Sequence, residues 1–118
     1  MDETSKRSIC RMVAGLIAID LDVDEGERQF LEKVLAKFGI ADSQWDAILP
    51  LMEPDEAFMA LKKLGPDERQ EALGLLLEAA TADHHVSEEE RDYLETICEA
   101  IDVDARELET RLERLLMR

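Results

Sequence analysis

The chain has 118 residues, of which 46% are hydrophobic, so it is long and apolar enough to fold as one domain around a single core. Its 29 acidic residues against 14 lysines and arginines give a net charge of −15, which excludes a role in binding nucleic acid or an anionic membrane because both would be repelled. The same charge favours cations and basic partners.

Helical periodicity extends along the whole sequence, and no alternation typical of a strand is sustained. It predicts seven helices, at about 5–20, 25–38, 42–50, 54–64, 66–82, 88–100 and 105–117. The apolar part of the first, residues 12–19, is too short to span a bilayer and shows no cleavage site, so we expect a core helix and no membrane insertion. Cys10 and Cys98 lie on apolar helix faces and are expected to be small core residues in a reducing compartment.

Helix-breaking residues and local composition predict where several of these helices begin or end, and which of them is central. Gly39 is expected to end the second helix. Asp42 is a candidate cap for the third, which carries Trp45 and which Pro50 should end. The helix at 66–82 is apolar almost all round in its second half, which predicts a central position in the bundle.

The chain also repeats itself. Residues 20–32 reappear without a gap 63 positions later, as residues 83–95, and seven of the thirteen positions are identical. Phe30 corresponds to Tyr93, and the apolar spacing continues at the same offset. A gapless period of this kind is typical of one supersecondary unit used twice. We therefore predict two pseudo-symmetric three-helix repeats, about 5–52 and 68–115, joined by the fourth helix.

Most of the repeated polar residues have ordinary structural explanations. Asp24 and Ser87 each precede a helix and have a glutamate three positions later, which is the capping-box pattern. Arginine and glutamate at i,i+4 follow in both copies, as Arg28 with Glu32 and Arg91 with Glu95, and pairs of this kind stabilise helices slightly.

Asp20 and Asp83 are harder to explain in this way, because each is expected at the negative end of a helix dipole, where a carboxylate is unfavourable. Either the loop that follows donates N–H bonds to the aspartate or a bound cation neutralises it. Oxygen ligands suit calcium or magnesium, and a histidine among them suits zinc. The candidate ligands are Asp20, Asp22, Asp24, Glu27, Asp83, His85 and Glu90. The first loop departs from an EF-hand, since Gly26 and Glu32 are each displaced by one position.

Catalytic motifs are not evident. The sequence has no phosphate-cradling glycine loop and no nucleophile elbow, and Cys98 has no activating neighbour in the sequence. We therefore expect a protein without enzymatic activity.

At Ala82-Asp83-His84-His85-Val86-Ser87-Glu88-Glu89-Glu90 the chain resembles the TerB-like family, which comprises tellurite-resistance TerB proteins and the N-terminal domain of DjlA-type co-chaperones. The resemblance covers most of the chain. It implies one all-α domain over residues 1–118, a compact seven-helix bundle, a cytoplasmic location and an acidic surface that binds metal or a partner. Where the family has glycine after the aspartate, this chain has His84, and Leu21 in the first copy. Because glycine takes positive φ far more readily, we expect the loop to differ.

These observations predict a non-catalytic binding module in a stress or metal-related response, with divalent cations at two acidic interhelical loops and an unidentified protein partner. The alternative is a protein-interaction domain whose acidic face recruits a basic partner without metal.

Overall fold

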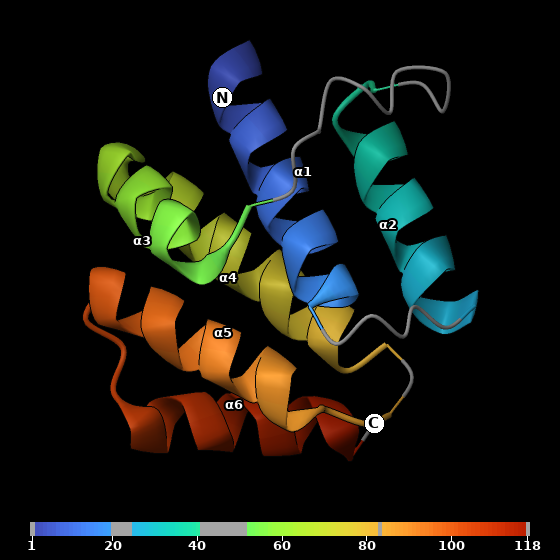
Figure 1. Cartoon of the computed structure of the whole chain (residues 1–118), viewed down its shortest axis with the longest axis vertical. Helices are drawn as coiled ribbons and strands as arrows, with labels where there is room; N and C mark the ends of the chain where they lie inside the picture. The colour runs from blue at the N-terminus through green and yellow to red at the C-terminus, as the bar shows by residue number, and fades with distance from the viewer. Residues whose placement is uncertain (1, 20–24, 41–51, 83, 118) are drawn as a thin grey trace.

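The computed structural model describes residues 2–19, 25–40, 52–82 and 84–117. Within these ranges the chain is all-α, with six helices and no strand (Figure 1). The helices are α1 (Glu3–Ala18), α2 (Glu25–Lys37), α3 (Pro54–Lys63), α4 (Pro66–Ala80), α5 (Glu88–Ala100) and α6 (Ala105–Leu116).

The described part of the chain holds six helices where the sequence predicts seven. The helix expected at 42–50, with Trp45 and Pro50, lies outside the described residues, so the seven-helix, two-repeat arrangement stays a prediction. The first helix begins earlier than expected. Asp2 caps it, accepting the Ser5 N–H at 2.7 Å, because the short acidic side chain satisfies a helix N–H that has no partner within the helix.

Two helices end at residues with left-handed backbone. Gly39 has φ of 75° after α2, which confirms its predicted role as the stop, and Asp102 has φ of 59° after α5. The amide that follows Gly39 bonds the carbonyl of Leu35 at 2.8 Å, and the one that follows Asp102 bonds that of Cys98 at 3.0 Å. These bonds satisfy carbonyls of the last helical turn. Gly39 and Asp102 are 63 positions apart, the offset of the sequence repeat.

Helix α4 occupies the centre of the bundle, as predicted. It packs against α1, α2, α5 and α6, and Figure 1 shows it behind α1 and α5. A central helix must bury more than one face, which explains its near-continuous apolar sequence. Its buried residues are Ala72, Leu73, Leu75, Leu76, Leu77, Ala79 and Ala80.

The segment that leads into α3 crosses α1 at close range. The Met52 N–H donates to the carbonyl of Arg11 at 3.3 Å, and the Met52 carbonyl lies directly over Gly15. The hydroxyl of Tyr93, on α5, donates to the same Met52 carbonyl at 2.9 Å. Tyr93 is fully buried, so its hydroxyl needs such an acceptor.

The two cysteines are core residues, as predicted. Cys10 and Cys98 are buried free thiols, and burial raises the pKa of each to about 11. They fill apolar space and are poor nucleophiles, because the thiolate is the reactive form. None of the described helices is both long enough and apolar enough to cross a membrane.

Candidate functional site

The second acidic segment begins where α4 ends. Thr81 caps the helix, and its Oγ1 donates to the carbonyl of Leu77 at 2.9 Å. The His84 N–H then donates to the carbonyl of Thr81 at 2.9 Å, and His84 has φ of 64°. His84 itself takes the positive φ that glycine takes most readily, and the expectation that this loop differs from the family's stays a prediction. Leu21, in the first copy, lies outside the described residues.

The same segment ends in the predicted capping box. Ser87 Oγ accepts the Glu90 N–H at 3.1 Å, and Glu90 Oε1 accepts the Ser87 N–H at 3.0 Å. The reciprocal bonds satisfy two amides that would otherwise lack partners at the start of α5. Asp24, which the sequence predicts as the corresponding cap before α2, lies outside the described residues.

Glu27 and Glu90 are both buried, each with 2% of its surface exposed, and they are 63 positions apart. Each lies in the first turn of its helix, where the helix dipole favours a negative charge. A buried carboxylate is costly unless its environment offsets the loss of water. The Ser87 amide supplies part of that for Glu90. Two buried carboxylates at matching positions are thus the most distinctive polar feature of the described residues.

The structure places three of the seven candidate metal ligands. Glu27 and Glu90 are buried, and His85 is exposed. Asp20, Asp22, Asp24 and Asp83 lie outside the described residues. Within the described ranges, no group of three or more histidine, cysteine, aspartate or glutamate side chains is arranged to hold a metal ion. A site at either loop would therefore need the aspartates that the structure does not describe.

The two repeated arginines behave differently. Arg28 pairs with Glu25 at 2.7 Å and with Glu32 at 3.7 Å on the exposed surface of α2, and the latter is the predicted i,i+4 pair. Arg91 pairs instead with Glu109, so the prediction of an Arg91–Glu95 pair is wrong. The reason is tertiary: α6 packs beside α5 and offers a carboxylate from outside the helix.

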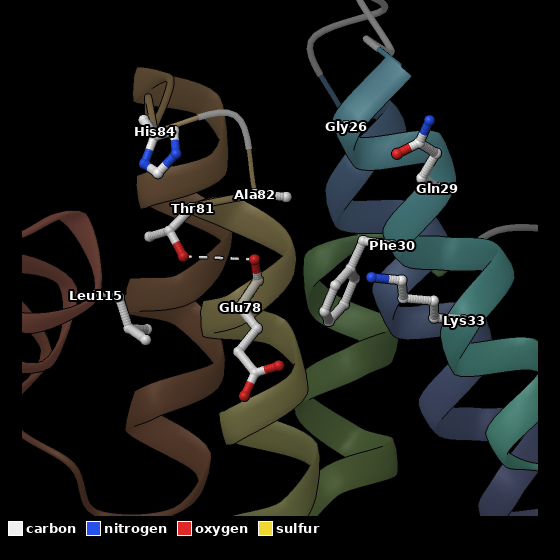
Figure 2. Close-up of a pocket in the computed structure, with 9 residues that line it drawn as sticks. All are labelled: Gly26, Gln29, Phe30, Lys33, Glu78, Thr81, Ala82, His84 and Leu115. Carbon is white, nitrogen blue, oxygen red and sulfur yellow. Dashed lines mark hydrogen bonds between the residues drawn. The ribbon is translucent and has the colours of Figure 1, made fainter. Parts of the chain in front are cut away.

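A pocket of about 340 Å³ lies beside the acidic segments. Figure 2 shows Phe30 and Lys33 on one wall, with Thr81, His84 and Leu115 across from them and Glu78 between. Gly26 belongs to the first acidic segment and His84 to the second, so residues from both segments meet at this pocket. Its lining residues are Gly26, Gln29, Phe30, Lys33, Glu78, Thr81, Ala82, His84 and Leu115.

Reasoning from the sequence missed this pocket. The helical spacing of Phe30 and Leu115 is that of core residues, yet both are only half-buried. One signal was present: Phe30 stands where the other copy has a tyrosine, which marks a position whose surroundings differ between the two copies.

A larger pocket, of about 420 Å³, lies between the first half of α1 and α3. None of its lining residues belongs to the acidic segments. Arg11 and Glu56 line it and pair with each other at 2.7 Å. That pairing satisfies one cation and one anion of the pocket wall internally, and Asp2 and Lys63 also line the pocket.

Comparison with known proteins agrees with the helical pattern. The family model described as tellurite resistance protein TerB matches residues 6–112, which is nearly the whole described chain. Searches of curated proteins and of solved structures give no match. With a family match of this extent, and with the capped, acidic start of α5 that the resemblance rests on, the chain belongs to the TerB family.

Proposed function

We propose that this TerB-family domain is a non-catalytic binding module in a stress or metal-related response, and that it binds divalent cations at its two acidic interhelical loops. The proposed ligands are Asp20, Asp22, Asp24 and Glu27 at the first loop, and Asp83, His85 and Glu90 at the second. Calcium and magnesium suit the oxygen ligands of the first loop, and zinc suits the second with its histidine.

The observation that supports this proposal is the matched burial of Glu27 and Glu90, each 2% exposed. Each buried carboxylate follows closely on the aspartates of its loop in the sequence. Carboxylates crowded together raise one another's pKa unless a cation neutralises them. Burial of the whole side chain in both copies favours a further use.

Thermal unfolding of chelator-stripped protein, measured with a panel of divalent ions at matched ionic strength, tests the proposal. An ion at about a hundred times its dissociation constant adds roughly 2.7 kcal/mol, which raises the melting temperature by several degrees for a domain of this size. The Asp20→Asn and Asp83→Asn double variant should lose that shift. The control is the Asp55→Asn and Asp67→Asn double variant, which removes the same amount of charge at two exposed positions elsewhere. It should keep the ion-induced rise in melting temperature. A flat panel with the wild-type protein would refute cation binding.

A second candidate function is recruitment of a basic partner by an acidic face, without metal. Helix α5 presents a row of exposed acids, Glu88, Glu89, Asp92, Glu95 and Glu99. Their spacing places them along one side of the helix. Such a row attracts a basic segment, and the attraction weakens steeply with salt.

Fluorescence anisotropy with a labelled lysine-rich peptide distinguishes the two candidates. The acidic-face function predicts binding that persists in a chelator, falls as salt rises, and is lost in a Glu95→Gln and Glu99→Gln double variant. The matched control is Glu53→Gln with Glu113→Gln, two exposed acids on other elements. Equal loss in both double variants would reduce the effect to net charge and would reject a specific acidic face.

A further inference from the structure

Three residues in one half of the bundle form a tight cluster. The Met52 carbonyl lies over Gly15 and accepts the Tyr93 hydroxyl at 2.9 Å. Met52 leads directly into α3, which packs against α5 more extensively than any other pair of helices in the structure. The cluster therefore fixes the start of a helix that covers α5.

The pocket of about 340 Å³ lies at the corresponding place in the other half. Adding or subtracting the repeat offset of 63 converts Met52, Gly15 and Tyr93 into Leu115, Glu78 and Phe30, and all three line the pocket. Two of these changes remove what positions the Met52 segment in the first half. Phe30 has no hydroxyl to donate, and Glu78 has a side chain where Gly15 has none, so no backbone segment could pass there as Met52 does.

Nothing among the described residues covers this face of α2 as α3 covers α5. Helix α2 packs mainly against α1 and α4, and Phe30 remains half-buried at the pocket wall. The covering helix α3 buries Ala57 and Leu61, and Leu64, the residue directly after the helix, is buried as well. Their spacing of i, i+4 and i+7 places them in one apolar stripe. The packing of α3 on α5 thus shows what kind of helix covers such a face.

The charge of the pocket differs from that of its counterpart. On α5 the positions that correspond to Gly26, Gln29 and Lys33 are Glu89, Asp92 and Thr96, whereas on α2 the three are neutral or basic. Lys33 is exposed and forms no ion pair within the part of the chain that the structure describes, and Figure 2 shows its side chain reaching beside Phe30. A ligand with a carboxylate near Lys33 would complement this wall, in a protein whose net charge is otherwise −15.

We propose that the pocket between α2, the end of α4 and α6 is a docking site for an amphipathic helix of a partner protein, with an apolar stripe at i, i+4 and i+7 and an acidic residue that pairs with Lys33. Such a helix would cover α2 as α3 covers α5. This helix-in-groove mode needs no cation, so it goes beyond the proposed metal function and can be tested independently of it.

The probe is a capped peptide with the sequence of residues 52–64 that carries the substitutions Lys62→Glu and Lys63→Glu, compared with the unsubstituted peptide. Each is titrated into isotope-labelled protein in a chelator, and amide resonances are followed by NMR. We expect saturable shifts at Gly26, Phe30, Lys33, Ala82 and Leu115, with tighter binding of the glutamate peptide. Because the net charge of the protein favours the lysine peptide everywhere else, a preference for glutamate reports this site.

Two variants test the assignment. Lys33→Glu should weaken the glutamate peptide about fivefold, the factor for an exposed ion pair of about 1 kcal/mol, and Lys63→Glu, on α3, is the matched control that should not. Gln29→Trp, at an exposed position of the wall, should fill the pocket and abolish binding.

Absence of saturable binding, shifts confined to other surfaces, a preference for the lysine peptide, or unaltered binding in Gln29→Trp would each overturn the proposal. Concentration-dependent shifts of the same amides without peptide, with a dimer in sedimentation, would also overturn it, because the occupant would then be a second copy of this chain.

Discussion

The carbonyl oxygen of Met52 lies so close to Gly15 that a β-carbon at Gly15 would overlap it. The contact is between the backbones of the two residues, with no side chain between them. The close approach lets the chain cross α1 and enter α3, and it places the Met52 carbonyl within reach of the Tyr93 hydroxyl. A glycine within a helix is usually a weakness, and here it is a requirement of packing.

Gly15→Ala is expected to destabilise the protein by about 1–3 kcal/mol, because the added methyl group must displace the Met52 backbone. The matched control is Gly74→Ala, since nothing lies within 4 Å of a β-carbon at Gly74 in α4. That variant is expected to gain about 0.4–1 kcal/mol from reduced freedom of the unfolded chain. Urea unfolding of both variants measures the two effects, and equal signs would contradict the packing described here.

Tyr93→Phe removes the hydroxyl that bonds the Met52 carbonyl at 2.9 Å. Because the site is buried, the acceptor loses its partner without gaining water, and we expect a cost of about 1–3 kcal/mol in the free energy of unfolding. Amide exchange of the first residues of α3 should also speed up. A change below a few tenths of a kcal/mol would mean that the hydroxyl does not anchor this segment.

Ser87→Ala removes the cap of α5 and leaves the Glu90 N–H without its acceptor. The expected loss is about 0.5–2 kcal/mol. Ser8→Ala, inside α1, deletes the same hydroxyl at a position that is not a cap, and should change stability by no more than a few tenths of a kcal/mol. If chemical denaturation gave the two variants the same stability, the capping box would be a minor contributor.

The thiols should be protected by the fold. Because burial raises the pKa of Cys10 and Cys98 to about 11, both stay protonated at pH 8, and reaction with a disulfide reagent should proceed only on unfolding. The unfolded thiols have a pKa near 9.0, so the stability that this difference provides is present below pH 9 and is lost as pH rises from about 9 to 11.

Burial also raises the pKa of Tyr93, so ionisation of the tyrosine at high pH lowers the free energy of unfolding in the same direction as ionisation of the thiols. Denaturation measured across this pH range should therefore show falling stability, with a shallower fall in a Cys98→Ala variant. Rapid labelling of the native thiols, or a flat profile, would show that the cysteines are accessible.

Local patterns predicted the helices well, because caps, stops and apolar spacing act within a few residues. Gly39 and the box at Ser87 and Glu90 lie where the sequence placed them. The all-α class and the central α4 follow from the same periodicity. The partner of Arg91 could not be predicted, since Glu109 is 18 positions away and reaches it only through the packing of α5 on α6.

The candidate site was predictable only in part. The repeat identified Glu27 and Glu90 as candidates. Their burial depends on tertiary packing, and the capping pattern in the sequence does not predict it. The pocket of about 340 Å³ depends on the half-burial of Phe30 and Leu115, which helical spacing alone treats as core. The left-handed backbone at His84 was also missed, because the cost for a residue other than glycine is small enough for the surrounding fold to override it.

The Tyr93 hydroxyl has a consequence for how the chain comes apart. It reaches a carbonyl that is 41 positions away and lies 3.4 Å from the Met12 carbonyl, 81 positions away, so a single side chain of α5 ties together segments from three distant parts of the sequence. Neither the N-terminal nor the C-terminal half can loosen without breaking this tie and exposing a buried acceptor. This tie couples the two halves and favours their unfolding as one cooperative unit, even though the sequence consists of two similar parts.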